Sequence, residues 1–306
     1  MNLVPKRCRL LAAGIALSSG ATAFADAPMF WSDSGIQGPP YAEIVTTHHR
    51  LALDHPGWAE YVEYGQSVGG RPLMLVKIQD PRFVGTTGRS AVVMSGSTHG
   101  NEYLNIEDRL PRWFLEARAT SSGLRRFFDA GGIIYAVPIL NPDGYERRER
   151  ENLNGTDLNR DFDLIPEREV HFKEPETRQL AAFLAQDLVA FDSRLKLTID
   201  YHCCDGSLLF PWAYANIPLP AAALAAHQAI GQAMQEIIDR SYQYGSTGQV
   251  LGYNPRGTSK DFYYAKYGTL AFTFEGSYAH ENQNFAKHTV FWDRILGRLD
   301  AAPGVR

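Results

Sequence analysis

Cysteine is scarce in this chain, which has three among 306 residues. Cys203 and Cys204 are neighbours, and Cys8 lies close to the start. So few cysteines exclude a fold held together by a disulfide framework, and a bridge between adjacent cysteines would close a strained ring. We therefore expect Cys203 and Cys204 to be free, buried thiols, and we expect buried apolar side chains to supply the stability.

An excess of positive charge is also lacking. The formal net charge is −4, whereas a protein that binds nucleic-acid phosphates would carry a basic cluster or stripe. Nucleic acid is therefore not expected as a partner. With 44% hydrophobic and 21% charged residues, the composition is that of a folded globular protein and not of a disordered or fibrous one.

Long apolar runs are missing beyond the first residues, so no later segment is expected to span a bilayer. Near the start, Lys6, Arg7 and Arg9 precede the stretch "LLAAGIALSSGATAF", which runs into the small residues of "AFA". This pattern is typical of a removable signal peptide. The alternative, a membrane anchor, is disfavoured because the stretch is short and rich in Gly, Ser and Ala. We expect residues 1–25 to be cleaved and residues 26–306 to form one domain.

Removal of the first 25 residues takes away three basic and no acidic residues, so the formal net charge would move from −4 to −7. We expect the remaining chain to be exported, to the periplasm or the medium, as a monomer without a stable membrane anchor.

Strand and helix patterns alternate along the rest of the chain. Predicted strands cover 58–65, 73–79, 91–95, 132–140, 195–202 and 269–276, and predicted helices cover 41–56, 105–118, 176–188, 221–240 and 281–299. The first two strands are expected to form a hairpin, Pro111 to kink the second helix, and a long loop to run from Asn141 to about Pro175. Apolar strands with helices between them predict a single α/β domain, with a mixed, mostly parallel twisted sheet and helices on both faces.

Polar residues follow four of the predicted strands. In such a sheet, ligands bind beyond the carboxyl ends of the strands. His99 and Glu102 follow one strand, "NPDG" follows the next, and His202 and Glu275 stand at the ends of two more. Two imidazoles, a carboxylate and a water form a tetrahedral zinc site, which makes His99, Glu102 and His202 candidate ligands. Taken singly, each also fits an ordinary polar turn, a core histidine or a solvated strand end.

Taken together, seven motifs in one order resemble a known family. The motifs are "HGNE", "NPDG", "DLNRDF", "EPET", "DYHCCDGSLLFPWAY", "GTSKDF" and "FTFE". They are similar to those of the zinc metallocarboxypeptidases of the carboxypeptidase A family, and the match runs from about Trp58 to the C-terminal helix. The resemblance implies the carboxypeptidase A-like fold and a peptide hydrolase with one zinc ion per chain.

Carried over to this chain, the resemblance implies that His99, Glu102 and His202 hold the zinc ion. It also implies that Asp157, in "GTDLNRDF", accepts a hydrogen bond from the first zinc histidine. Such a partner fixes the tautomer and raises the basicity of the ligand. Glu275 corresponds to the general base that takes a proton from the attacking water.

The same resemblance implies how the end of the substrate is held. Asn159 and Arg160 match the residues that bind the free terminal carboxylate, for which a planar guanidinium is well suited. Tyr253 matches a mobile tyrosine that closes over this carboxylate. Arg150 best matches the arginine that stabilises the oxyanion, although Arg147 and Arg148 stand close by in "YERRERE".

Lys260, in "TSKD", falls where the family carries the residue at the base of the substrate pocket. A lysine there should attract a second carboxylate, so an acidic terminal residue is expected. The alternative is that Lys260 points to solvent. Asn101 departs from the digestive members, which carry an arginine between the zinc histidine and glutamate, so the outer subsites should differ.

Three other functions stay open at this stage. Peptidoglycan stem peptides, with their extra carboxylates, are alternative substrates of a carboxypeptidase or amidase. An N-acyl amino acid deacylase of the aspartoacylase type also carries "HGNE", although "NPDG", "DLNRDF" and "GTSKDF" favour the peptidase. The third is a catalytically inactive peptide-binding module, which would usually have lost the base or a ligand.

Overall fold

The computed structural model describes residues 35–163 and 172–299. The predicted signal peptide, residues 1–25, lies outside these ranges. Among the helices that are described, none combines the length and the apolar character needed to cross a membrane.

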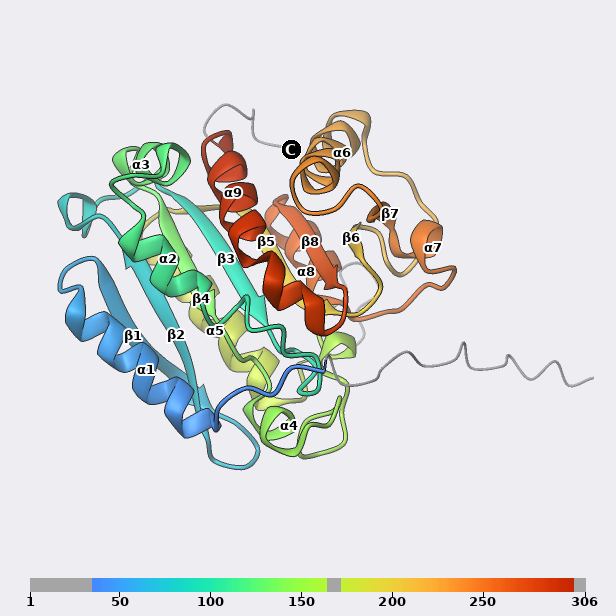
Figure 1. Ribbon diagram of the computed structural model, residues 1–306, viewed down its shortest axis with the longest axis horizontal. Helices are drawn as coiled ribbons and strands as arrows, with labels where there is room; N and C mark the ends of the chain where they lie inside the picture. Colours follow the sequence, from blue (N-terminus) through green and yellow to red (C-terminus); the bar gives the residue numbers. More distant parts are fainter. Residues whose placement is uncertain (1–34, 164–171, 300–306) are drawn as a thin grey trace, which may run out of the picture. The chain divides into compact units, whose positions relative to one another are not determined.

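The described residues form eight strands and nine α-helices (Figure 1). The strands are β1 Ala59–Gln66, β2 Pro72–Gln79, β3 Ser90–Gly96, β4 Ile133–Val137, β5 Arg194–Cys203, β6 Ser207–Phe210, β7 Gln243–Ser246 and β8 Leu270–Gly276. The helices are α1 Tyr41–Asp54, α2 Leu110–Glu116, α3 Ser122–Asp129, α4 Pro142–Arg147, α5 Pro175–Ala190, α6 Ala221–Ile237, α7 Thr247–Val250, α8 Ser259–Tyr267 and α9 Phe285–Leu296. Short 3-10 helices cover Pro81–Phe83, Leu158–Arg160 and Ala279–Asn284.

All of these strands belong to one sheet in the order β1-β2-β4-β3-β5-β8-β6-β7. The four central strands, β4, β3, β5 and β8, run parallel to one another, whereas β1, β2 and β6 add antiparallel pairings. The expectation of a mixed, mostly parallel sheet is confirmed. Parallel strands need crossovers, and the helices between the strands supply them.

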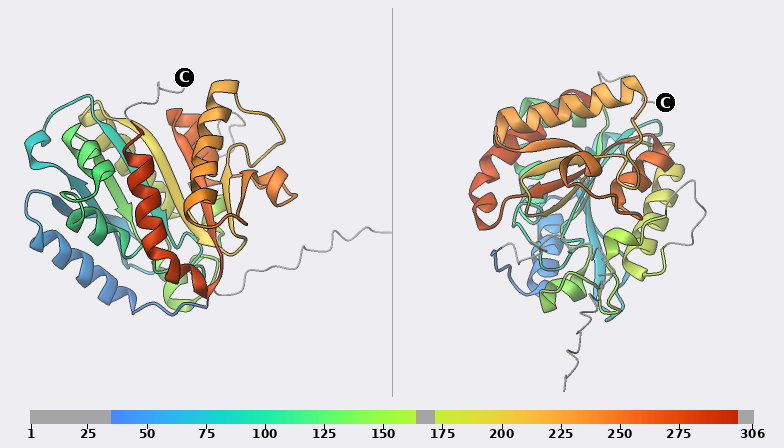
Figure 2. Two further views of the ribbon diagram at one scale, coloured as in Figure 1. Left: turned by 45° about the horizontal axis from the view of Figure 1, so that its top comes forward. Right: turned by 90° about the vertical axis from the view of Figure 1, so that its right-hand side faces the viewer.

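Successive residues of a strand point to opposite faces of the sheet, so apolar side chains must be buried on both faces. Helices cover both faces for this reason. Val92 and Met94 of β3 face a core that also contains side chains of α2, α3, α6 and α9. Ala91 and Val93 face a second core with α5 and α8. The right-hand view of Figure 2 shows α9 and α5 on opposite sides of the strands.

Some predicted boundaries need correction. The helix expected over 105–118 covers only Leu110–Glu116, and the expected kink at Pro111 is wrong. Pro111 lies in the first turn of α2, where the missing N–H has no helical partner to lose. The loop expected from Asn141 to about Pro175 contains α4, and α3, α7, α8, β6 and β7 were not predicted.

The carboxyl ends of β3, β4, β5 and β8 meet at one edge of the sheet, as the sequence predicted. In the parallel ladder of β5 and β8, His202 is the register partner of Glu275. The two side chains that were singled out on these strands are therefore neighbours through backbone pairing.

Candidate metal centre and active site

His99, Glu102 and His202 come together at this edge of the sheet. One ligand atom from each lies within 4.8 Å of the other two, and all three side chains are buried. The Nδ1 atoms of the two histidines are 3.1 Å apart, and Oε2 of Glu102 lies 3.0 Å from Nδ1 of His202. Two imidazoles and one carboxylate aimed at a common point are a donor set that fits zinc and leaves a fourth position open.

The outer nitrogen of each imidazole is held by a carboxylate. Nε2 of His99 lies 3.0 Å from Oδ1 of Asp157, and Nε2 of His202 lies 2.9 Å from Oδ2 of Asp200. A carboxylate accepts the Nε2–H proton and leaves the lone pair of Nδ1 for a metal. Asp157 therefore lies where the sequence placed it, whereas Asp200 was not predicted.

Asp200 connects three elements around His202. Its carboxylate accepts hydrogen bonds from Ser95 of β3 at 2.8 Å, from Thr98 at 2.9 Å and from Ser259 of α8 at 2.9 Å. Residues two apart on a strand point to the same face, so Asp200 and His202 of β5 lie side by side. The pattern Asp-x-His at the end of an apolar strand is the signal that could have identified this carboxylate.

The turn between the two closely spaced ligands packs against the start of α4. A Cβ at Gly100 would meet the backbone carbonyl carbon of Gly144 at 2.0 Å, so only glycine fits at this position. Asn141 caps α4 by accepting a hydrogen bond from the N–H of Gly144 at 2.9 Å. The "NPDG" motif thus builds the surface on which the turn with the candidate ligands His99 and Glu102 rests.

Glu275 ends β8 beside the ligand cluster. It is 9% exposed, and burial raises its pKa to about 8, with the charge of Glu102 acting in the same direction. A group that titrates near neutrality can both accept and return a proton.

Arg150 is the arginine of "YERRERE" that reaches the ligands. Its Nη1 lies 3.0 Å from Oε1 of Glu102, and its Nε and Nη2 donate to Asp157 at 3.1 and 2.9 Å. Arg147 instead pairs with Glu149 at 2.6 Å. Of the arginines that the sequence left as alternatives, Arg150 therefore contacts a candidate ligand, whereas Arg147 pairs with Glu149 instead.

Seven of the predicted site residues line one small pocket of about 20 Å³, whereas Glu102, His202 and Asp157 do not line it. Those that line it are His99, Arg150, Asn159, Arg160, Tyr253, Lys260 and Glu275. Asn159 is fixed by the N–H of Ser259, which donates to its side-chain oxygen at 3.0 Å. Arg160 Nη1 donates to the carbonyl of Asn159 at 2.8 Å, and Tyr253 is 39% exposed at the pocket.

Lys260 does not point to solvent. It is 2% exposed, and its Nζ lies 3.4 Å from Oγ1 of Thr273, another residue of the pocket wall. Burial lowers the pKa of Lys260. Asp261, the neighbouring acid, accepts hydrogen bonds from the backbone N–H groups of Ala213 and Tyr214 at 2.9 and 3.1 Å. No ion pair of Lys260 occurs within the described ranges.

Cys203 and Cys204 are joined by a disulfide bond, so the expectation of free thiols is wrong. Strand β5 ends at Cys203, and the chain bends from Cys204 onward. The backbone N–H of Cys203 donates to Oε2 of Glu102 at 3.2 Å. The disulfide therefore directly follows one candidate ligand, His202, in the sequence, and its first cysteine contacts another, Glu102.

Comparison with known proteins gives a consistent picture. A family model described as "Zinc carboxypeptidase" matches residues 44–291. Carboxypeptidase B from Helicoverpa zea is 25% identical over 262 residues, which are 72% of this chain and 58% of that protein. Mast cell carboxypeptidase A from Rattus norvegicus is 25% identical over 268 residues, 76% of this chain and 62% of that protein. The chain thus spans about three-fifths of the length of these relatives.

Solved structures show the same fold. The carboxypeptidase A from Helicoverpa armigera superposes with a TM-score of 0.70 at 24% identity, covering 88% of this chain and 75% of that one. Thrombin activatable fibrinolysis inhibitor superposes with a TM-score of 0.73 at 19% identity, covering 86% and 74%.

Proposed function

Because the chain belongs to the zinc carboxypeptidase family, we propose that it hydrolyses the last peptide bond of substrates with a free terminal carboxylate, and that it favours an acidic terminal residue. The activity, the substrate and the roles of individual residues are all part of this proposal. One observation carries it: the three candidate ligands converge beside a pocket that also contains Glu275 and Arg160.

His99, Glu102 and His202 would hold a zinc ion, which supplies a Lewis acid for the scissile carbonyl and lowers the pKa of water. Asp157 and Asp200 keep the two imidazoles in the tautomer that a metal needs. These two contacts fix the orientation of both imidazoles through the protein's own carboxylates.

Arg160 binds the terminal carboxylate of the substrate, assisted by Asn159 and Tyr253. A guanidinium can donate two parallel hydrogen bonds to a carboxylate, which an internal peptide bond does not offer. This explains why only the last residue would be removed. The partly exposed Tyr253 lies where it can cover the bound end.

Glu275 takes a proton from the attacking water and later gives it to the departing amine. Arg150, whose guanidinium lies among the ligand side chains, stabilises the negative charge that develops on the carbonyl oxygen. To do so, Arg150 moves one N–H from its contact with Glu102 to the substrate, while Asp157 keeps hold of the other side of the guanidinium.

Lys260 selects the terminal side chain. Its ammonium group is buried in the pocket wall and forms no ion pair among the residues described, although Asp261 and Glu275 act on its charge. A buried charge without an ion pair is costly, and a carboxylate from the substrate would reduce that cost. The pocket therefore favours a terminal Glu or Asp.

The test is a comparison of peptides that end in Glu, Gln, Leu or Arg, each with a free or an amidated end, using zinc-loaded protein. Release of the last residue from free ends only, fastest for Glu, supports the proposal. Cleavage of amidated peptides at a similar rate contradicts the role of Arg160. Equal rates for Glu and Gln contradict the role of Lys260.

The same assay separates the alternatives. Release of acetate from N-acetylaspartate without peptide cleavage would assign the deacylase activity. Peptidoglycan stem peptides test the second substrate class. Zinc binding and peptide binding without any turnover would make the chain a binding module.

We also propose that residues 1–25 are a signal peptide and that residues 26–306 form an exported, monomeric catalytic domain. Support comes from the basic, apolar and small-residue pattern at the start of the sequence. The mass of the protein recovered from cell fractions, with its N-terminal sequence, tests the cleavage after Ala25, and light scattering tests the monomer.

A further inference from the structure

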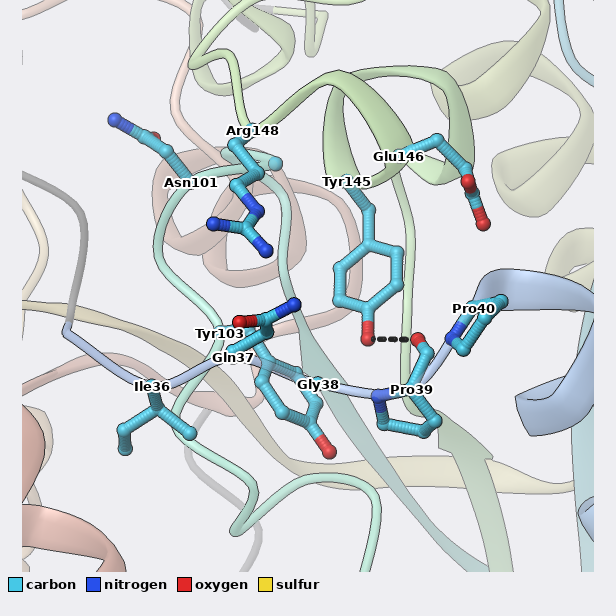
Figure 3. A pocket seen from close by; sticks show the side chains of 11 residues that line it. Ile36, Gln37, Gly38, Pro39, Pro40, Asn101, Tyr103, Tyr145, Glu146 and Arg148 are labelled. Carbon is cyan, nitrogen blue, oxygen red and sulfur yellow. Dashed lines mark hydrogen bonds between the residues drawn. The ribbon is translucent and has the colours of Figure 1, made fainter.

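A second and larger pocket lies behind the metal-binding turn. It has a volume of about 210 Å³ and is enclosed by the segment at 36–40, the turn at Gly100 and Asn101, and α4 (Figure 3). None of its lining residues lines the pocket that contains Arg160 and Lys260.

The position of this pocket relates it to the path of a substrate. Gly100 and Asn101 line it, while their neighbours His99 and Glu102 turn toward the metal centre. Arg148 lines it as well, two residues before Arg150 in the other pocket. The pocket therefore adjoins the candidate ligands, and the residues of a peptide that precede its scissile bond are the part of the substrate that could reach it.

Two of the lining side chains, Tyr103 and Tyr145, are aromatic rings whose hydroxyl groups are hydrogen-bonded. The hydroxyl of Tyr145 donates to the carbonyl of Pro39 at 2.7 Å, and that of Tyr103 donates to Asn105 at 2.9 Å. The two rings meet at 72° with their centres 5.3 Å apart. Since both hydroxyls are engaged elsewhere, the rings offer carbon surfaces to the stem of a side chain.

The charge in the pocket is positive. Figure 3 shows the guanidinium of Arg148 directed toward Gln37, and no ion pair of Arg148 is found within residues 35–163 and 172–299. Glu146, the acidic residue of the lining, points away from Arg148, and its carboxylate accepts a hydrogen bond from the N–H of Tyr41 at the start of α1. Arg148 is exposed, so its guanidinium is accessible, and a guanidinium beside two aromatic rings suits a carboxylate on a short aliphatic stem.

Building on the proposed carboxypeptidase function, we propose that this pocket binds an acidic side chain upstream of the scissile bond, with its carboxylate on Arg148 and its stem against Tyr103 and Tyr145. The protein would then recognise acidic side chains at two positions of the substrate, the terminal residue and one residue before the scissile bond.

The probes are acetylated alanine tetrapeptides that end in Glu and carry either Glu or Gln at one of the three upstream positions. For the zinc-loaded full chain, kcat/KM should be higher for Glu than for Gln at one position, by about threefold to tenfold, the range of a partly exposed ion pair. Arg148→Gln should bring that ratio close to one. Arg147→Gln, which removes the neighbouring arginine, should leave the ratio unchanged.

A ratio near one at all three positions, or a preference that survives in Arg148→Gln, overturns the subsite. Calorimetry with a Glu275→Gln variant measures the affinity of the same peptides for the subsite without turnover. If no peptide is hydrolysed by the wild type, the proposed function fails. In that case a Glu preference in binding that depends on Arg148 still supports the subsite, and equal affinities overturn it.

Discussion

Oδ2 of Asp200 lies 2.9 Å from Nε2 of His202, two residues further along the same strand. A second carboxylate, Asp157, holds Nε2 of His99 at 3.0 Å. Each candidate imidazole ligand therefore has its own anionic partner, and both partners act through the nitrogen that faces away from the ligand cluster. The pair on β5 is the more deeply buried of the two, since Asp200 is 2% exposed.

Asp200→Asn should weaken zinc binding by about 10- to 100-fold, because an amide oxygen stabilises the required tautomer less than a carboxylate does. Competition with a chelator of known affinity measures the change. Asp205→Asn, which alters an exposed acid on the following turn, is the matched control and should bind zinc as the wild type does. An unchanged zinc affinity of Asp200→Asn would show that the hydrogen bond does not tune the ligand.

Glu275→Gln should lower kcat by about 10²- to 10⁴-fold while zinc binding is retained, because the substitution removes a proton acceptor and keeps the size of the side chain. Zinc content and kcat are measured on the same preparation. The control Glu60→Gln changes an exposed glutamate of β1 and should keep full activity. A Glu275→Gln enzyme that kept most of its kcat would exclude Glu275 as the base.

Lys260→Met should reduce the preference for a terminal Glu over Gln by about 10- to 100-fold in kcat/KM, the worth of a charged hydrogen bond in a buried site. Lys260→Asp should turn the preference toward terminal Lys or Arg. Lys266→Met removes an exposed lysine of the same helix and should have no effect on specificity. An unchanged terminal-residue profile in both Lys260 variants would refute this assignment.

Ionisation of Glu281 should make the free energy of unfolding depend on pH in the acidic range. Glu281 lies fully buried after β8, and its Oε1 is 2.8 Å from Nε2 of His288 in α9. Its other oxygen accepts hydrogen bonds from Tyr242 and from the N–H of Ser277. Burial alone would raise the pKa of Glu281, but these partners lower it from 4.5 to about 2.

Because the folded-state pKa lies below the ordinary value, the stabilisation by Glu281 is complete above pH 4.5 and is lost as the pH falls toward 2. Glu281→Gln should lower the free energy of unfolding by about 2 to 3 kcal/mol at neutral pH. Denaturant unfolding of both proteins at several pH values should show this difference shrinking below pH 4.5. A difference that stays constant with pH would mean that ionisation of Glu281 does not contribute, and Glu43→Gln serves as the exposed control.

The central strands of the fold were predictable because their apolar runs are long. β5 and β8 stand out as buried strands, and the turn residues "SVGGR" identify the hairpin of β1 and β2. β6 and β7 have only four residues each, too few for an alternation of apolar and polar residues to be recognised. Their place in the sheet depends on pairing with β8 and with each other.

The candidate site was predictable where a motif fixes a spacing, as with His99 and Glu102. The partner of His202 was not found, although Asp200 stands two residues before it on the same strand, where the Asp-x-His spacing places both side chains on one face. The bond between Cys203 and Cys204 was judged unfavourable from their adjacency, and nothing in the sequence pattern indicated it. The pocket of about 210 Å³ that contains Arg148 is lined by three segments that are distant along the chain, and no local sequence pattern indicates it.

The pairing of His202 with Glu275 across β5 and β8 fixes how these two side chains lie relative to each other. Their separation is set by main-chain ladder bonds in the middle of the sheet, so loop insertions or exchanges at the rim would leave it intact. A slip of β8 by one residue would turn Glu275 to the opposite face, away from His202. Changes in the surrounding loops are therefore expected to reshape the pocket without altering the spacing of His202 and Glu275.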